Sequence, residues 1–290
     1  MSLITKIFVL LGTLVSFASA AGAQSLDIDA VDAMVKAYGP SDGPGISVAI
    51  AQDGEVIYEG WTGMADLERA VPISRDTRFP IASTSKQFTA FATMKLADEG
   101  KLSLDQELRD FFPDFGQSGD GVSVKHLLEH TGGLREFNTI TQILGFSEAS
   151  LILPEASLAS IKRQDGRNFD PGTQEEYSNT GYQLLAHIVE RVSGVPFEEY
   201  MRAEVFEPLG MTKSLVHRDP TILTPDLALS YAPGRSAMYN FLYVSEVIGS
   251  SGIVSTPSDL VRWGHALNTG GVGNAQIIET MNKRTRLANG

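Results

Sequence analysis

The chain has 290 residues, of which 42% are hydrophobic and 20% charged, and its formal net charge is -12. This composition is typical of a globular protein with a sizeable core, and the acidic balance disfavours nucleic acid or an anionic membrane surface as a partner. Because the chain has no cysteine, disulfides, thiolate nucleophiles and cysteine-bound zinc are excluded, so covalent catalysis would need an oxygen or nitrogen nucleophile.

The first 23 residues have the pattern of a secretory signal peptide. Lys6 precedes a mostly apolar run over residues 7–17, and residues 21–23 supply an A-x-A cleavage pattern. The run is too short to span a bilayer, and no later stretch approaches the roughly 20 apolar residues required. We therefore expect a mature protein that begins near Gln24, is periplasmic or secreted, and does not stay inserted in the membrane. An uncleaved N-terminal anchor is the alternative.

Two strands are predicted at residues 46–51 and 55–61. The first is an apolar run rich in β-branched residues, the second alternates, and Asp53-Gly54 between them is a strong hairpin signal. A hairpin alone is barely stable in water, so it needs further strands. After Thr269 the sequence offers one short candidate, around Ile277-Ile278.

Helices are predicted for much of the chain that follows. Apolar periodicity predicts a helix from Ser85 to Gly100, a short one over 122–130, and the clearest one from Asn179 to Gly194. A short strand at 253–254 and a helix at 257–267 come later, whereas residues 134–170 and 216–245 indicate loops with short elements. We expect an α/β (α+β) fold with two lobes, one an antiparallel sheet flanked by helices and the other all-helical over about residues 82–245.

Ser83 and Lys86 form an S-x-x-K pattern where a loop becomes a helix. A spacing of three places both side chains on one helical face, and the free N–H groups of a helix N-terminus favour an oxyanion. A lysine one turn away can accept the hydroxyl proton if burial lowers its pKa, or it can stabilise negative charge. The alternative is a serine cap followed by a solvated lysine.

The surroundings of this pattern resemble the serine β-lactamases and penicillin-binding proteins, whose signature begins with S-x-x-K. Tyr177-Ser178-Asn179, just before the clearest helix, is similar to the second element of that signature. Residues 127–134, 207–211 and 252–260 resemble the family's "LL-x-H-T-x-G-L", "PLGM" and "GG-hydrophobic-x-ST...DL" stretches, and together these matches cover roughly residues 40–270. The Tyr-x-Asn form resembles the branch of class C β-lactamases, D,D-peptidases and related esterases.

The resemblance implies acyl transfer through a serine ester, at a seam between the two lobes. Ser83 would attack a carbonyl, and Tyr177, as phenolate or hydrogen-bonded to Lys86, would act as the base. Asn179 would orient Lys86 and the substrate amide. A packed loop aromatic and a helix N-cap are the alternative roles of Tyr177 and Asn179. No metal or organic cofactor is implied. The substrate, a small molecule or peptide such as a β-lactam, a D-alanyl peptide or a carboxylic ester, stays open, as does the oligomeric state.

The family's third element, Lys-Thr-Gly or His-x-Gly on a strand beside the site, is not found after Lys213. By resemblance, this strand supplies an oxyanion-binding N–H, and the family's last strands would pair with the initial hairpin. We therefore expect residues 24–290 to form a C-terminally incomplete domain that is weakly active at best, because removing one oxyanion donor typically costs about 10²–10³ in turnover.

Two other functions are weighed against this one. His126, Glu129 and His130 match H-x-x-E-H, the inverted zinc-peptidase motif, with both histidines placed on one helical face. The same residues fit the "LL-x-H-T" turn better, in which His130 would bond to the backbone. The second alternative is a binding or sensor module on the same fold without catalysis, which the missing third element favours.

Overall fold

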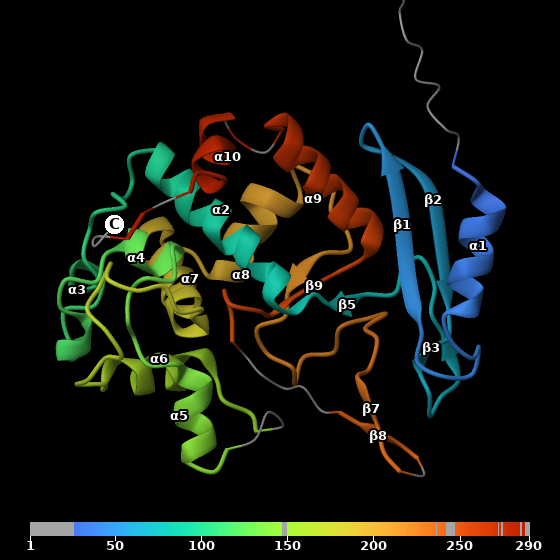
Figure 1. Cartoon of the computed structure of the whole chain (residues 1–290), viewed down its shortest axis with the longest axis horizontal. Helices are drawn as coiled ribbons and strands as arrows, with labels where there is room; N and C mark the ends of the chain where they lie inside the picture. Colours follow the sequence, from blue (N-terminus) through green and yellow to red (C-terminus); the bar gives the residue numbers. More distant parts are fainter. Residues whose placement is uncertain are drawn as a thin grey trace, which may run out of the picture.

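The computed structural model describes residues 26–146, 150–235, 237–241, 247–271, 273, 275–284 and 286–287. The signal peptide predicted over residues 1–23 lies outside these ranges. A β-hairpin with one covering helix stands beside a larger, mainly helical part (Figure 1). Within the described ranges, every helix is too short or too polar to cross a bilayer.

The hairpin is formed by β1 (Ile46–Gln52) and β2 (Glu55–Thr62), which pair in antiparallel register. Asp53 and Gly54 between them both have positive φ, 53° and 86°, which the tight two-residue turns of hairpins require. The predicted hairpin is therefore confirmed. The sequence did not predict α1 (Ile28–Ala37), which packs against β2 (Figure 1).

In the described part of the chain, the remaining strands are short and form three small antiparallel sheets. One has the order β5-β9-β6, and the other two are the pairs β3-β4 and β7-β8. Because β6, β7 and β8 lie within residues 82–245, the expectation that this lobe is all-helical is wrong. β9 is wholly buried, so it needs a partner on each side for its backbone groups. The bounds are β3 Met64–Asp66, β4 Val71–Pro72, β5 Phe79–Pro80, β6 Leu215–Val216, β7 Tyr231–Pro233, β8 Met238–Asn240 and β9 Ile253–Ser255.

The helical part is built around α2 (Ser85–Asp98), which contacts α7 (Asn179–Ser193) most extensively. The predicted apolar face of α2 is fully buried, and its Phe88 stacks on Trp263 of α9 with ring centroids 4.2 Å apart. Both predicted helices are confirmed. The other helices are η1 Ala82–Thr84, α3 Leu108–Phe111, η2 Gln117–Gly119, α4 Val124–Leu128, α5 Phe137–Ile143, α6 Pro154–Lys162, α8 Phe197–Met201, η3 Arg202–Phe206, α9 Pro257–Thr269 and α10 Ala275–Met281.

The strand predicted around Ile277-Ile278 is wrong, because both residues belong to α10. Ile277 is buried in the main core, and Ile278 and Met281 pack against the same core. A spacing of four residues places Ile277 and Met281 on one helical face. Contact with α2 therefore outweighs the β-propensity of the two isoleucines.

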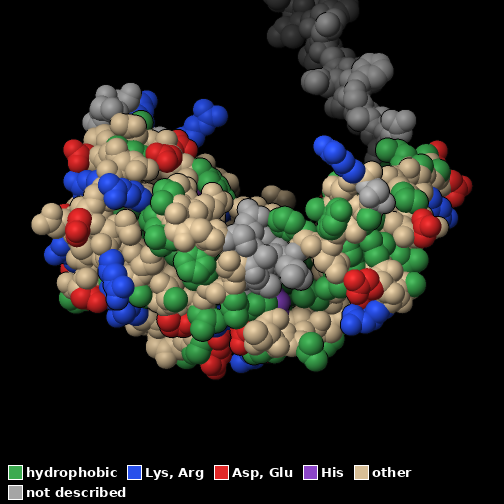
Figure 2. Space-filling model, turned by 90° about the horizontal axis from the view of Figure 1, so that it is seen from below, with side chains coloured by type: hydrophobic (Ala, Val, Ile, Leu, Met, Phe, Trp, Pro, Cys, Tyr) green, Lys and Arg blue, Asp and Glu red, His purple; other side chains and the backbone are tan. Residues whose placement is uncertain are grey.

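Acidic and basic side chains are interspersed on the face that Figure 2 shows. No broad cluster of lysines and arginines interrupts this mixture on that face.

Candidate active site

Ser83 lies in η1, the single turn that leads into α2, and its side chain is exposed. The preceding Ala82 has a φ of 47°, a left-handed conformation that non-glycine residues adopt only where their surroundings fix it. Here the amide of Ile81 donates to the carbonyl of Ile253 in β9 over 3.0 Å. A buried strand therefore holds the turn that presents the Ser83 hydroxyl.

Lys86 is buried one turn further along α2, with 7% of its surface exposed. Its Nζ donates to Ser83 Oγ at 3.3 Å, to Asn179 Oδ1 at 2.8 Å and to the Ser250 carbonyl at 2.8 Å. An ammonium group has three donors, so each one has a partner. Burial lowers the pKa of Lys86, and the neighbouring Tyr177 opposes this shift.

The segment that supplies the third acceptor crosses the first turns of α2. Thr89 Oγ1 donates to the Gly249 carbonyl at 2.8 Å, and the Ile253 amide donates to Ser85 Oγ at 3.3 Å. Gly249 has a φ of 85°, and a Cβ there would lie 2.3 Å from a backbone oxygen of α7, so only glycine fits. These contacts direct the Ser250 carbonyl at Lys86. No pattern in the sequence identifies this acceptor, because every residue has a carbonyl.

Tyr177 completes the group from the loop before α7. Its phenol oxygen donates to Ser83 Oγ over 2.7 Å, and Lys86 Nζ lies 4.6 Å from the centre of its ring. Tyr177 is 55% exposed, so the site opens to solvent at the two hydroxyls. The structure thus brings together all four residues that the sequence singled out, namely Ser83, Lys86, Tyr177 and Asn179.

A second phenol, Tyr182, lies near the same ammonium but in a different environment. Lys86 Nζ is 5.6 Å from its ring centre, yet its hydroxyl is turned away and donates to the Leu128 carbonyl at 3.1 Å. Burial, followed by the nearby Tyr177, raises the pKa of Tyr182 to about 12. Tyr182 is therefore kept as a neutral donor, which leaves Tyr177 as the phenol that contacts the serine.

Ser178, rather than Asn179, caps α7. Ser178 Oγ accepts from the Gly181 amide at 3.0 Å, and Asn179 is the first helical residue. The alternative role of Asn179 as the N-cap is therefore wrong. Because the neighbouring serine caps the helix, the Asn179 side chain is available to Lys86.

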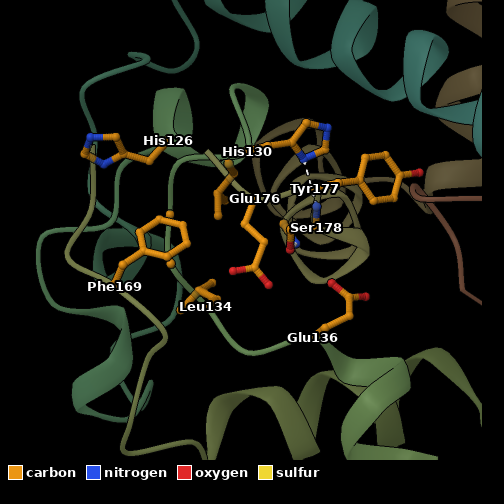
Figure 3. Close-up of a pocket in the computed structure, with 12 residues that line it drawn as sticks. His126, His130, Leu134, Glu136, Phe169, Glu176, Tyr177 and Ser178 are labelled. Carbon is orange, nitrogen blue, oxygen red and sulfur yellow. Dashed lines mark hydrogen bonds between the residues drawn. The ribbon is translucent and has the colours of Figure 1, made fainter. Parts of the chain in front are cut away.

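Two side chains from residues 130–136 bind the backbone at the start of α7, and Figure 3 shows one of these bonds, between His130 and Ser178. His130 Nδ1 accepts from the Ser178 amide at 3.1 Å, and Glu136 Oε2 accepts from the amides of Asn179 and Thr180 at 2.9 and 3.4 Å. The expectation that His130 is a turn residue bonded to backbone is confirmed. Glu136 was not predicted from the sequence, since a lone glutamate outside a motif carries no signal.

The geometry contradicts the zinc-peptidase hypothesis. α4 ends at Leu128, and His130 follows it with a φ of 60°, so the two histidines of H-x-x-E-H do not share a helical face. His126 Nδ1 accepts from the Ser123 amide at 3.2 Å in the capping box of α4. Over the described ranges, no group of three or more histidine and acidic side chains could hold a metal ion.

The chain is similar to proteins of one known family. The family described as "Beta-lactamase" matches residues 31–289. A D-aminopeptidase of Brucella anthropi is 27% identical over 245 residues, which are 82% of this chain and 45% of the relative. Penicillin-binding protein 4* of Bacillus subtilis (strain 168) is 29% identical over 238 residues, 76% of this chain and 51% of the relative. The chain thus spans about half the length of these curated relatives.

This chain matches a larger share of one protein of known structure. The D-amino acid amidase from Ochrobactrum anthropi SV3, complexed with L-phenylalanine amide, superposes with a TM-score of 0.74 at 26% identity. The match covers 86% of this chain and 72% of the amidase. This similarity confirms the predicted fold class.

Proposed function

The chain belongs to the beta-lactamase family, and from this premise we propose that it is a serine hydrolase that cleaves an amide or ester through an acyl ester on Ser83. One observation carries the proposal: Ser83 Oγ lies 2.7 Å from the Tyr177 phenol oxygen and 3.3 Å from Lys86 Nζ. A hydroxyl in reach of a base and a cation is the arrangement of an activated nucleophile. The relatives include a D-aminopeptidase and an amidase, which supports hydrolysis as the reaction class.

In the acylation step, Tyr177 acts as a phenolate and accepts the proton of Ser83. Ser83 Oγ forms a bond to the substrate carbonyl carbon, and the carbonyl oxygen becomes an oxyanion near the N-terminus of α2, where the helix dipole favours negative charge. Tyr177 then passes the proton to the leaving amine or alcohol as the bond to that group breaks. The ammonium of Lys86 stabilises the negative charge on the phenol oxygen throughout.

In the deacylation step, the same groups act on water. Tyr177, again a phenolate, takes a proton from a water molecule as the water oxygen bonds to the acyl carbon. The ester bond to Ser83 breaks, the serine regains its proton from Tyr177, and a carboxylic acid leaves. Asn179 takes part indirectly, because its Oδ1 holds Lys86 at 2.8 Å. One tyrosine therefore serves as base and acid in both halves of the reaction.

The names of the relatives give an order in which to test substrates. Amides of D-amino acids come first, because a D-aminopeptidase and a D-amino acid amidase both align with this chain. β-Lactams and small carboxylic esters follow, since they form the same acyl-serine.

The proposal includes a cellular location: we infer that the protein is exported, cleaved after residue 23 and active in the periplasm or outside the cell. N-terminal sequencing of protein from the extracellular or periplasmic fraction should begin near Gln24.

A fluorophosphonate probe tests the proposed chemistry, since it bonds only to activated serines. The unsubstituted protein should be labelled once, at Ser83, and Ser83→Ala should abolish the label. Thr84→Ala is the matched control, because it removes the adjacent exposed hydroxyl and should leave labelling intact. Labelling that persists in Ser83→Ala would contradict the proposal. A folded protein that takes no label would favour the non-catalytic binding module.

A further inference from the structure

The segment that runs from Tyr177 into the first turn of α7 has a side-chain acceptor for each of four consecutive backbone N–H groups. His130 accepts from residue 178 and Glu136 from residues 179 and 180, while the cap accepts from residue 181. The first N–H groups of a helix have no partner inside it, so these acceptors decide where the helix starts. Both His130 and Glu136 belong to the segment of residues 130–136. The hydrogen bonds to Ser83 come from Lys86 and Tyr177 and not from this segment.

We propose, building on the function proposed above, that His130 and Glu136 are positioning residues that hold Tyr177 and Asn179 over Ser83. They do so by accepting hydrogen bonds from the backbone amides of residues 178–180. The carboxylate of Glu136 lies at the N-terminus of α7, where the helix dipole favours negative charge. It fixes the residue that contacts Lys86. His130 fixes the residue next to the phenol.

His130 holds Tyr177 at three points. Its Nδ1 accepts from the Ser178 amide, its carbonyl accepts from the Glu176 amide at 2.9 Å, and its ring lies 4.9 Å from the ring of Tyr177. The other neighbouring ring is that of Tyr182, 5.0 Å away. His130 itself is fixed in a left-handed conformation. The imidazole thus bonds to the residue after Tyr177 and packs against its ring, while the backbone carbonyl of His130 bonds to the residue before it.

This role requires an unprotonated Nδ1, since only then can the ring accept the Ser178 N–H. The charged and titratable groups that face His130 are Lys86 from α2, Glu175 and Tyr177 from the loop, and Tyr182 from α7. Burial and the charge of Lys86 lower the pKa of His130, whereas Glu175 raises it. Protonation in acid would turn Nδ1 into a donor and release the Ser178 amide, so activity should fall on the acid side.

Paired substitutions at His130 separate this role from general stability. His130→Ala removes the acceptor, and we expect kcat to fall about 10- to 100-fold with little change in KM, as displacement of a reacting group by about 1 Å can cost 10²-fold. His130→Asn keeps an acceptor atom near the position of Nδ1 and tolerates positive φ. It should restore most of kcat and remove the part of the acid limb that His130 contributes, because an amide does not titrate, whereas the part that belongs to Tyr177 as the base should stay.

Two controls make the result specific. His126→Asn changes a histidine that also accepts a backbone N–H through Nδ1 but contacts α4 instead of the loop, and it should keep the parent's kcat. Adding His130→Ala to Tyr177→Phe should cost less than about 3-fold more, because the group being positioned is already absent. For the acidic partner, Glu136→Gln keeps an acceptor oxygen and should retain more activity than Glu136→Ala.

The outcomes are distinguishable from failure of the proposed function. If the parent shows no Ser83-dependent turnover, the proposed function fails, and nitrogen NMR of the His130 ring then tests the inference directly. The expected tautomer carries its proton on Nε2 and leaves Nδ1 free. A proton on Nδ1, full activity in His130→Ala, an acid limb in His130→Asn that is unchanged from the parent's, or independent losses in the double variant would each overturn the inference.

Discussion

Replacing Tyr177 by phenylalanine removes a single oxygen from the site and leaves the ring in place. That oxygen contacts Ser83 at 2.7 Å, whereas the ring keeps its packing against His130 and Lys86. Because Tyr177 is 55% exposed, losing its neutral hydrogen bond should change the free energy of unfolding by about 1 kcal/mol or less. A positioned acid–base group contributes about 10²–10⁴-fold to rate, which corresponds to about 3–5 kcal/mol of barrier. We therefore expect a slow variant of nearly normal stability.

The assay is burst kinetics with a chromogenic 4-nitrophenyl ester, paired with thermal unfolding of the same samples. Tyr182→Phe is the matched control: it removes a buried hydrogen bond to Leu128 and so costs about 1–3 kcal/mol of stability, but it should acylate within a few-fold of the parent. The acylation rate should thus fall mainly in Tyr177→Phe, and the free energy of unfolding mainly in Tyr182→Phe. The reasoning is refuted if Tyr177→Phe acylates within about 3-fold of the parent, or if Tyr182→Phe is equally slow.

Three further predictions concern the ammonium, an ion pair and the core. Lys86→Met leaves the Ser250 carbonyl without its donor and should slow fluorophosphonate labelling at least about 10²-fold; labelling at the parent's rate would contradict this. Burial raises the pKa of Glu190, but hydrogen bonds, one from Arg218, outweigh it and lower the pKa to about 2. The unfolded chain then binds more protons than the folded one, so the free energy of unfolding should fall as pH drops from above 4.5 towards 2. In Glu190→Gln the urea midpoint should depend less on pH over that range. Phe88→Ala should cost about 3–5 kcal/mol in urea unfolding, because Phe88 is fully buried and stacked on an indole ring; a cost below about 1 kcal/mol would contradict its place in the core.

Local chemistry made part of the fold predictable. The hairpin followed from Asp53-Gly54, because few residue pairs accept positive φ at both turn positions. The helix that begins at Asn179 followed from an apolar stripe, and Gly194, with a φ of 78°, ends it as expected. In both cases the signal lies within a few residues of the feature it predicts.

Features decided by distant contacts were missed. Ile277 and Ile278 favour a strand by propensity, but packing on α2 makes them helical. α1 was not predicted, and its main contact is with β2, so its stability depends on a partner some twenty residues away. The three-stranded sheet joins strands that lie far apart in the sequence, and short strands of this kind leave little pattern to detect.

The site divides in the same way. Ser83 and Lys86 were predictable because their spacing puts them on one helical turn, and Tyr177 and Asn179 because of the motif they resemble. The acceptors around them, such as the Ser250 carbonyl and Glu136 Oε2, belong to no motif. They become apparent only when the fold brings residues 130–136 against the start of α7 and residues 249–253 against α2.

The central claim is that the hydroxyl of Ser83 becomes acylated during turnover. The most direct measurement is rapid-quench intact-mass spectrometry with a D-amino acid ester and a penicillin, followed by peptide mapping of the adduct. The proposed mechanism predicts one added acyl group per chain, located on Ser83, that forms more slowly in Tyr177→Phe and is absent from Ser83→Ala. Substrate hydrolysis without any protein-bound acyl group, or an adduct on another residue, would contradict it.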